Sequence, residues 1–472
     1  MTPPSAQPNV PGRGIVASYS PRFWMLVLLI GVGAGLGGVV LMELLRGVQH
    51  LAWSYSGKRI EPVTFLIAVE HTSAARRVLV LAIGGVVAGV GAILLARRAA
   101  GSEVSEALWL RGARLPLVGS LARAAHSIVI VGLGASLGRE GAPQQAGAAL
   151  ASALSDWAQL PEWQRRLLVA CGAGAGMAAV YNVPLGGALF ALEVLLGTLA
   201  LPLVLPALAT ALIATAVAWV ALPTAATYVI PPYGVSGSQI AWAVVVGPIA
   251  GLAAVAYIRV IARAHSLRPA GRARLTAPIL VFTALGVLAI AYPQVLGNGK
   301  NVVQLALVGR LSLTLLAVLF VLKPLATAAC LGSGAPGGLF TPTLAYGVLL
   351  GGLLGHAWSA IWPGAPEGSY ALIGGAAVLA ASMQGPLAAV VLLLELTRRA
   401  DGLMVPVLLA VVEATVIARL MGAQSIYSAR LSVQRTPAAA EREPEGIGDR
   451  AIEAALGSPG GPSADAAPTT GG

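Results

Sequence analysis

The stretch Gly138-Arg139-Glu140-Gly141-Ala142-Pro143 places an arginine and a glutamate between glycines in a strongly apolar part of the chain. A predicted membrane span, residues 117–137, leads into it, and a second helical segment, 144–154, follows it. An ionisable side chain at such a place is costly in lipid and usually serves a function. Glu140 is therefore the first candidate functional residue.

The composition identifies the surroundings of this stretch as a membrane. Of the 472 residues, 57% are hydrophobic and 10% are charged, and the mean hydropathy is +0.81. Several uncharged runs exceed the roughly 20 residues that one helix needs to cross a bilayer. The runs lack the alternation of a membrane β-barrel. We predict an all-α polytopic membrane protein with at least ten membrane segments.

The net charge of +11 is spread along the chain as pairs of basic residues at the ends of the apolar runs. Such pairs are typical of membrane topology signals and lipid-headgroup contacts, and they argue against binding of nucleic acid. Cys171 and Cys330 both lie in Gly- and Ala-rich apolar sequence, which favours packing over a disulfide or a metal site. We expect no metal and no cofactor.

Three regions are predicted along the chain. Residues 1–21 are rich in Pro, Ser and Gly and are expected to form a disordered cytoplasmic arm. Residues 432–472 are too poor in large apolar residues to fold, and are expected to form a disordered tail with no regulatory domain. The transmembrane domain is therefore expected over 22–431, with both termini cytoplasmic.

The transmembrane domain contains an internal repeat. Pro184 precedes Glu193 by nine residues, and Pro386 precedes Glu395 by the same distance. A glycine-rich break ending in proline lies about forty residues upstream of each. We predict two related halves, about 76–222 and 273–420. Transporters built from such repeats bind their substrate where discontinuous helices of the two halves meet near the middle of the membrane.

Three breaks in the apolar sequence are predicted to begin helices, at Ser102, Glu140 and Leu339. Irregular backbone at membrane depth has to line a cavity or be buried in protein. The free amides and positive dipole of a helix N-terminus attract an anion, and without a full buried cation the anion is still able to leave. The hydroxyls of Ser102 and Tyr427 are candidate neutral donors to it.

Glu140 has two interpretations at this point. A carboxylate at a helix N-terminus competes with a permeant anion for the same field and releases the site when it is protonated, which describes a gate coupled to pH. Alternatively, the carboxylate is a structural cap of its own helix. The six residues alone favour neither.

Together the motifs resemble those of the ClC family of chloride channels and proton-coupled chloride transporters, over about residues 22–431. The resemblance rests on three stretches: Gly138-Arg139-Glu140-Gly141; Gly334-Ala335-Pro336-Gly337-Gly338-Leu339-Phe340-Thr341-Pro342; and Tyr427 at the start of the expected last helix. It implies an inverted two-fold repeat with discontinuous helices and a homodimer with one pore per subunit, of prokaryotic type, in the bacterial inner membrane. It also implies an anion held by Ser102, Tyr427 and the amides of Leu339 and Phe340, with Glu140 as the gating carboxylate.

The chain departs from the family pattern in three places. Where the family often has Gly-Ser-Gly-Ile-Pro, this chain has Gly-Ser-Glu-Val-Ser, so Glu103 follows the expected ligand directly. Ala142 separates Gly141 from Pro143, where Gly-Pro is usual. Coupled members commonly have a second glutamate after the first proline segment, whereas here Glu193 is followed by Val194, which cannot bind a proton. Glu413, in the last span, is a further acid, expected to serve packing or an interface rather than as a replacement relay.

These features predict chloride transport that is passive or weakly coupled to protons, gated by Glu140. Proton/chloride antiport is the alternative. The fluoride-selective pattern of the family has Met in place of the serine ligand, so Ser102 favours chloride. A remote alternative from another class is an intramembrane hydrolase, because Gly134-Ala135-Ser136-Leu137-Gly138 matches a nucleophile elbow. The five histidines show no pairing with Ser136, and we expect the protein not to be an enzyme.

Overall fold

The computed structural model describes residues 19–54, 64–97 and 102–431, which are almost entirely helical and contain one isolated β-bridge. The expected arm and tail lie outside this part of the chain, apart from residues 19–21. The hydroxyl of Ser20 caps α1 (Pro21–Trp53) by accepting from the amide of Phe23, and proline begins the helix. The folded region therefore starts slightly before the predicted boundary.

The first half has one long helix followed by a series of shorter ones. After α1 it contains α2 (Thr64–Glu70), α3 (Ala74–Arg97), α4 (Val104–Leu110), α5 (Leu117–Gly132), α6 (Gly141–Trp157), α7 (Glu162–Tyr181), α8 (Pro184–Leu189) with the π-helical η2 (Phe190–Leu196), and α9 (Leu201–Ala218). The predicted proline break at Pro184 is present. Asn182, in the left-handed conformation, ends α7, and Pro184 begins the next helix.

The second half repeats this order. It contains α10 (Gly237–Ser266), α11 (Ala273–Ala291), η3 (Pro293–Val295), α12 (Lys300–Leu307), α13 (Leu313–Gly332), α14 (Phe340–Ile361), α15 (Glu367–Met383), α16 (Pro386–Thr397), η4 (Asp401–Leu403) and α17 (Met404–Leu420). When α2 and the short 3₁₀ turns are left out, the helices from α1 to α9 correspond in order to those from α10 to α17. Each half begins with a long helix, its third helix (α4 or α12) has only one to two turns, and its last helix but one (α8 or α16) is short and begins with proline. The similarity thus begins at α1 and α10.

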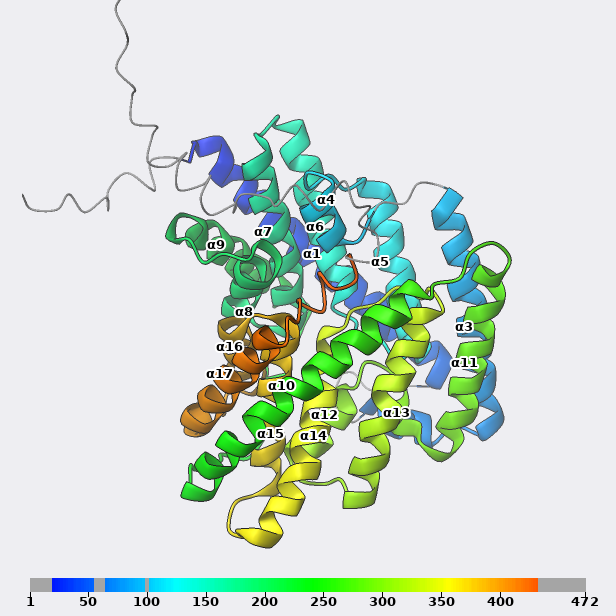
Figure 1. Cartoon of the computed structure of the whole chain (residues 1–472). Coiled ribbons are helices and arrows are strands. Elements are labelled where there is room, and N and C mark those ends of the chain that lie inside the picture. The colour runs from blue at the N-terminus through cyan, green and yellow to red at the C-terminus, as the bar shows by residue number, and fades with distance from the viewer. Residues whose placement is uncertain (1–18, 55–63, 98–101, 432–472) are drawn as a thin grey trace, which may run out of the picture.

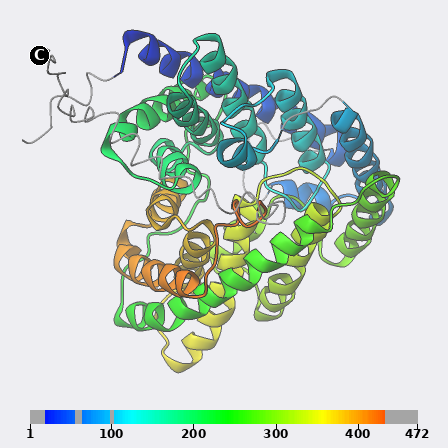
Figure 2. The ribbon, with the colours of Figure 1, turned by 45° about the horizontal axis from the view of Figure 1, so that its top comes forward.

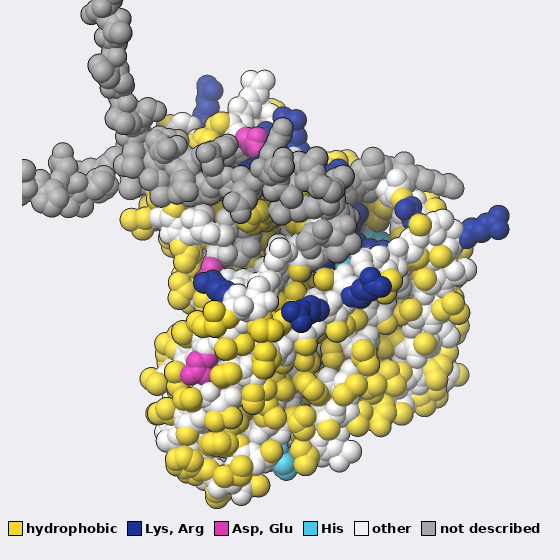
Figure 3. Space-filling model, in the orientation of Figure 1, with side chains coloured by type: hydrophobic (Ala, Val, Ile, Leu, Met, Phe, Trp, Pro, Cys, Tyr) yellow, Lys and Arg dark blue, Asp and Glu magenta, His cyan; other side chains and the backbone are white. Residues whose placement is uncertain are grey.

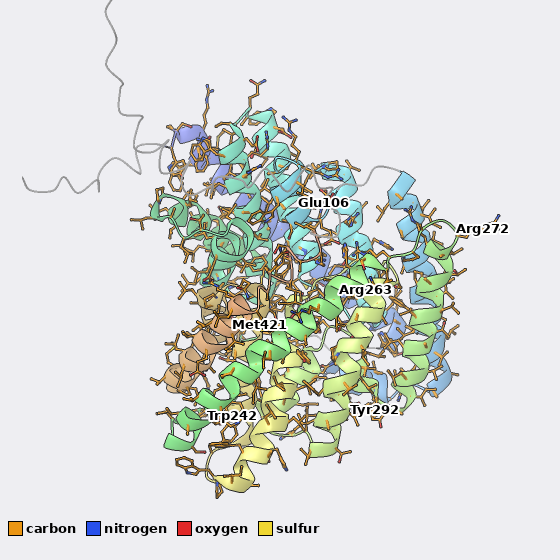
Figure 4. The ribbon with its side chains drawn as sticks, in the orientation of Figure 1. Glu106, Trp242, Arg263, Arg272, Tyr292 and Met421 are labelled. Carbon is orange, nitrogen blue, oxygen red and sulfur yellow. The ribbon has the colours of Figure 1, made fainter. Side chains whose placement is uncertain are left out.

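The two halves lie against each other with equivalent helices in contact. The pair α3 and α11 packs side by side at one end, while α8 and α16 meet nearer the other, where α9 and α17 form an edge of the molecule (Figure 1). In the view with the top of the molecule brought forward, the last described turn of the chain lies at the boundary between the halves (Figure 2). The helix α10 crosses the second half obliquely, from Trp242 at the lower end to Arg263 at the upper (Figure 4).

The repeated glutamates explain part of this packing. Glu193 Oε1 and Oε2 accept from the amides of Leu387 (3.2 Å) and Ala388 (2.6 Å), in the first turn of α16. Glu395 does the same to the first turn of α8, at Leu185 (3.1 Å) and Gly186 (2.7 Å). These amides have no partner within their own helices. Each half therefore caps the proline-initiated helix of the other, and the contact is reciprocal.

The outer surface is suited to lipid. Eight described helices are long and apolar enough to cross a membrane, namely α1, α3, α9, α10, α11, α13, α14 and the segment that ends in α17. Three shorter apolar helical segments, 117–132, 184–196 and 386–397, bring the number of apolar segments above the ten expected. Figure 3 shows hydrophobic side chains over most of the lower body, and Lys and Arg in a band across the upper half. The protein is a multi-pass membrane protein.

Candidate anion site

The two predicted glycine breaks meet in the structure. Gly138 and Gly338 exchange two backbone hydrogen bonds, from Gly138 N to Gly338 O at 2.7 Å and from Gly338 N to Gly138 O at 2.8 Å. The bridge is antiparallel. As a result, the N-termini of α6 and α14, which occupy equivalent places in the two halves, are brought together in the interior.

The carboxylate of Glu140 lies across this junction. Oε1 accepts from the amide of Phe340 at 2.8 Å, and Oε2 accepts from the hydroxyls of Tyr181 at 3.1 Å and Thr341 at 3.3 Å. Glu140 is the N-cap residue of α6, yet its side chain makes no cap hydrogen bond there. Of the two interpretations left open by the sequence, a cap of its own helix is therefore wrong. The carboxylate instead occupies the anion-attracting N-terminus of α14.

Glycine is required around the carboxylate for steric reasons. A Cβ on Gly138 would lie 1.9 Å from Glu140 Oε1, and a Cβ on Gly338 would lie 2.3 Å from the same atom. A Cβ on Gly141 would lie 2.9 Å from the amide nitrogen of Gly338. The glycine pattern thus permits the close approach of two helix ends and a carboxylate. Pro342 is buried in the first turn of α14, where the missing amide hydrogen costs nothing.

Ser102 and Tyr427 are buried, with exposed fractions of 5% and 8%. Within the described residues, neither hydroxyl has a hydrogen-bond partner. The structure corrects two expectations here. The N-cap of α4 is Glu103 and not Ser102, and Tyr427 lies in a turn and not at the start of a helix. A turn leaves the ring free to pack edge-on against Phe190, at a centroid distance of 5.5 Å.

Tyr427 and Leu339 line a small cavity of about 60 Å³ together with Gly338 and Gly141. This volume exceeds what a single water needs. The walls therefore include the N-terminus of α14 and the phenol ring. The Tyr427 hydroxyl and the helix N-terminus are neutral donors of the kind that a dehydrated anion requires. The charged side chains of Glu103, Arg123 and Arg430 also line this cavity, whereas Ser102 does not.

Two larger cavities share lining residues with this small one, Arg123 in the first case and Tyr427 in the second. One, of about 490 Å³, is lined by Ser102, by Glu106 and by five arginines, among them Arg123, Arg268 and Arg274. The other, of about 500 Å³, is lined by Tyr427, Val194 and Arg419 among others. Cationic walls raise the local concentration of anions. Ser102 thus lines the first of these cavities, and Tyr427 lines both the second and the small one.

Glu103 does not leave an unbalanced negative charge beside Ser102. Its carboxylate contacts Arg430 Nη1 at 2.7 Å and Arg268 Nη2 at 3.2 Å. Burial raises the pKa of Glu103, but the guanidinium groups of Arg430 and Arg268 outweigh it and hold the pKa well below its usual range. The acid that departs from the family pattern is therefore ionised and neutralised by its neighbours.

Arg139 is also buried, and its guanidinium lies 4.9 Å from the centroid of the Tyr181 ring. The same tyrosine bonds Glu140, and its hydroxyl is 2.7 Å from Thr341 Oγ1. We did not single out Tyr181 or Thr341 from the sequence. Thr341 belongs to the glycine-rich motif of residues 334–342, which indicates a site, whereas no local pattern marks Tyr181, the last residue of α7.

The remaining acids and Ser136 have other environments. The Ser136 hydroxyl pairs with Thr327 Oγ1 at 3.3 Å, so the partner that a hydrolytic nucleophile needs is replaced by a second hydroxyl. Glu413 packs on α10, where a Cβ added at Gly247 would lie 2.7 Å from the Glu413 Cβ. Val194 is buried against Gly385, at the start of α16.

A discontinuous-helix membrane protein whose two halves join helix N-termini at a buried carboxylate belongs to the class of ion transport proteins. The family model described as "Voltage gated chloride channel" matches residues 80–419. The chain belongs to this family, the ClC family.

Among curated relatives, a "Putative chloride channel protein ClcB-like" of Ralstonia nicotianae is 34% identical over 86% of this chain and 96% of its own length. A "Voltage-gated ClC-type chloride channel ClcB" of Citrobacter koseri is 31% identical over 86% and 98%. These relatives are named as channels and not as enzymes.

Solved structures show the same fold. A slow cyanobacterial Cl⁻/H⁺ antiporter has a TM-score of 0.76 at 21% identity, covering 90% of this chain and 100% of its own. A CLC-type fluoride/proton antiporter has a TM-score of 0.68 at 22% identity, covering 86% and 97%. The expected fold, an all-α membrane protein with an inverted repeat of discontinuous helices, is confirmed.

Proposed function

We propose that the protein transports chloride across the membrane, in a channel-like manner or with weak proton coupling, and that Glu140 is its gate. The single observation that carries the proposal is the bond between Glu140 Oε1 and the Phe340 amide. A carboxylate at the N-terminus of α14 occupies the place where a permeant anion would bind, so the two compete. Protonation removes the charge of the carboxylate and thereby favours the anion.

The proposed ligands of the anion are the Ser102 and Tyr427 hydroxyls and the amides of Leu339 and Phe340. Ser102 and Tyr427 support this assignment because their hydroxyls are buried without a partner among the described residues. A site of neutral donors favours a weakly hydrated monovalent anion such as chloride, because such a site balances entry against release.

Two observations favour weak or absent proton coupling. Val194 has no titratable group and packs against the start of α16. Glu193, its neighbour, has both carboxylate oxygens bonded to amides of α16. Glu193 lines the cavity beside Tyr427, but a proton transferred to it would weaken both of these hydrogen bonds. Proton/chloride antiport is the second candidate, because Glu140 itself is a proton-binding group inside the pathway.

The test is chloride efflux from proteoliposomes, recorded together with the internal pH. We expect chloride efflux that depends on the protein, with proton movement well below stoichiometric. Proton uptake in a constant ratio to chloride, driven against a proton gradient, would establish the antiporter instead. No protein-dependent anion flux under either gradient would refute transport altogether.

We further propose a homodimer in a bacterial inner membrane, with both termini cytoplasmic. The face formed by α9 and α17 supports a dimer, since it exposes large apolar side chains from both halves. They include Leu201, Leu205 and Leu212 of α9, and Val405, Val412 and Val416 of α17. Because the two helices are equivalent in the repeat, a second copy related by two-fold symmetry can match this face with its own.

A further inference from the structure

Glu103 connects three distant segments of the chain. It precedes α4, while Arg268 lies just beyond α10 and Arg430 lies in the last described turn. Its two oxygens are divided between the two arginines, Oε2 to Arg430 at 2.7 Å and Oε1 to Arg268 at 3.2 Å. The Arg430 side chain is almost fully buried, with 7% exposed, and Glu103 is 27% exposed. With Arg268 at 29% exposed, the network is buried at Arg430 and partly exposed at its other two members.

The network is adjacent in sequence to both hydroxyl groups of the anion site. Ser102 immediately precedes Glu103, and Tyr427 lies three residues before Arg430. The Arg430 guanidinium is 5.9 Å from the centroid of the Tyr427 ring, and its Nε donates to the carbonyl of Ile426 at 3.3 Å. One ion pair therefore spans the gap between the backbone that bears Ser102 and the turn that bears Tyr427.

Within the described residues, the Tyr427 hydroxyl has no hydrogen-bond partner of its own. Its turn is held by the amide of Ile426, which donates to Ser382 O at 2.8 Å, and by Arg430. Ser102 is likewise held through its backbone, whose carbonyl accepts from Gln145 Nε2 at 3.1 Å. The positions of the two hydroxyls thus depend on the contacts that fix the backbone of their segments.

We propose that Glu103, with Arg430 and Arg268, is a positioning residue that sets the separation of the Ser102 and Tyr427 hydroxyls and thereby the anion selectivity. The inference rests on the proposed function. A rigid pair of donors discriminates between anions of different size, whereas a loosened pair adapts to each of them. Glu103 and Arg430 also line the small cavity, but because their charges are paired with each other, their effect on the ion comes through the positions of the two hydroxyls.

The experiment compares the permeability of chloride with that of nitrate and bromide, for purified full-length protein in proteoliposomes. Glu103→Gln keeps the size of the side chain and removes its charge. We expect the chloride-to-nitrate ratio to change by about tenfold, which corresponds to about 1.4 kcal/mol. Arg430→Gln should shift the ratio in the same direction, and the double variant should shift it no further than the larger single change, because both residues act through one interaction.

The matched control is Glu162→Gln, since Glu162 pairs with Arg166 at 2.7 Å on α7 and lines none of the three cavities described above. Its ratio should stay at the wild-type value. An unchanged ratio in Glu103→Gln, or an equal change in both variants, would overturn the positioning role. If Glu103→Gln does not fold, Arg268→Gln and Arg430→Gln provide the same comparison. If the wild-type protein shows no anion flux, the proposed function itself is refuted. This outcome is distinct from a failure of the positioning role, which requires flux in the wild type.

Discussion

Glu140 begins one helix and binds the beginning of another. Its carboxylate has three donors, the Phe340 amide and the hydroxyls of Tyr181 and Thr341. Hydrogen bonds to a charged group contribute roughly 1.5–3 kcal/mol each. All three are strongest for the ionised carboxylate, so the loss of its charge weakens the whole arrangement at once. This weakening is the physical basis of the proposed gate.

We predict that flux rises as the pH falls in the wild-type protein and that Glu140→Gln gives high flux with little pH dependence. The glutamine cannot ionise, so it competes weakly with the anion at every pH. The measurement is chloride efflux from proteoliposomes at a series of external pH values. A pH profile in Glu140→Gln that matches the wild type would show that the gate is another group.

Two other acids serve as controls for this measurement. The pKa of Glu103 is held well below its usual range by Arg430 and Arg268. Glu103 therefore stays ionised from about pH 5 upward and contributes no step there, so Glu103→Gln should keep the pH dependence. Glu413→Gln should also keep it, because Glu413 packs against α10 rather than at the junction of the glycine breaks.

At the scale of elements, the short helices α8 and α16 depend on each other. Each begins at a proline and receives a glutamate from the opposite half at its second and third residues. A proline at the first position and a carboxylate near the N-terminus are both favourable to a helix. The nine-residue spacing from proline to glutamate follows from this exchange, because it places each glutamate beside the start of the partner helix.

We predict that Glu193→Ala and Glu395→Ala destabilise the protein to a similar extent, each by about 1–3 kcal/mol, because each leaves one exposed and one partly buried amide of a helix N-terminus without its charged partner. Thermal unfolding in detergent measures the two against the wild type. The pair also tests a proton role. If Glu193 were a relay, its variant alone would change proton movement, whereas a structural pair predicts that both variants leave the proton-to-chloride ratio unchanged.

At the scale of the whole molecule, the arrangement of the halves leaves α9 and α17 along one edge (Figure 1). Leu212 is 50% exposed and Val412 is 55% exposed, so this edge needs a cover of lipid or protein. The reciprocal caps lie between the halves and link this edge to the helices of the anion site. A dimer through this face would leave the two sites separate, one in each subunit.

We predict that the purified protein has twice the mass of the 47.5 kDa chain in mild detergent. Val412→Trp should shift it toward the monomer, because an oversized side chain in a close-packed contact costs about 1–3 kcal/mol. Leu280→Trp is the control, since Leu280 is 69% exposed on α11, at the other end of the molecule. Light scattering after size exclusion reports the mass. A monomeric wild type at micromolar concentration would contradict the dimer.

The sequence by itself determined the membrane class, the places where helices break and the presence of two halves. These features are local: hydrophobic runs of sufficient length, glycine and proline at the breaks, and a repeated spacing. It also singled out Glu140, because a charge in such surroundings stands out from the composition. Its prediction that Ser102 caps α4 was wrong, since a hydroxyl before two acids indicates a cap without showing which residue has the required backbone conformation.

Only the tertiary structure decided which groups Glu140, Glu103, Glu193 and Glu395 contact. The donors to Glu140 include Phe340, which is 200 residues away, and Arg430 is 327 residues from Glu103. Contacts over such separations are set by how the two halves pack, and no local pattern encodes them. The role of each carboxylate therefore depends on the amide or guanidinium that folding brings beside it.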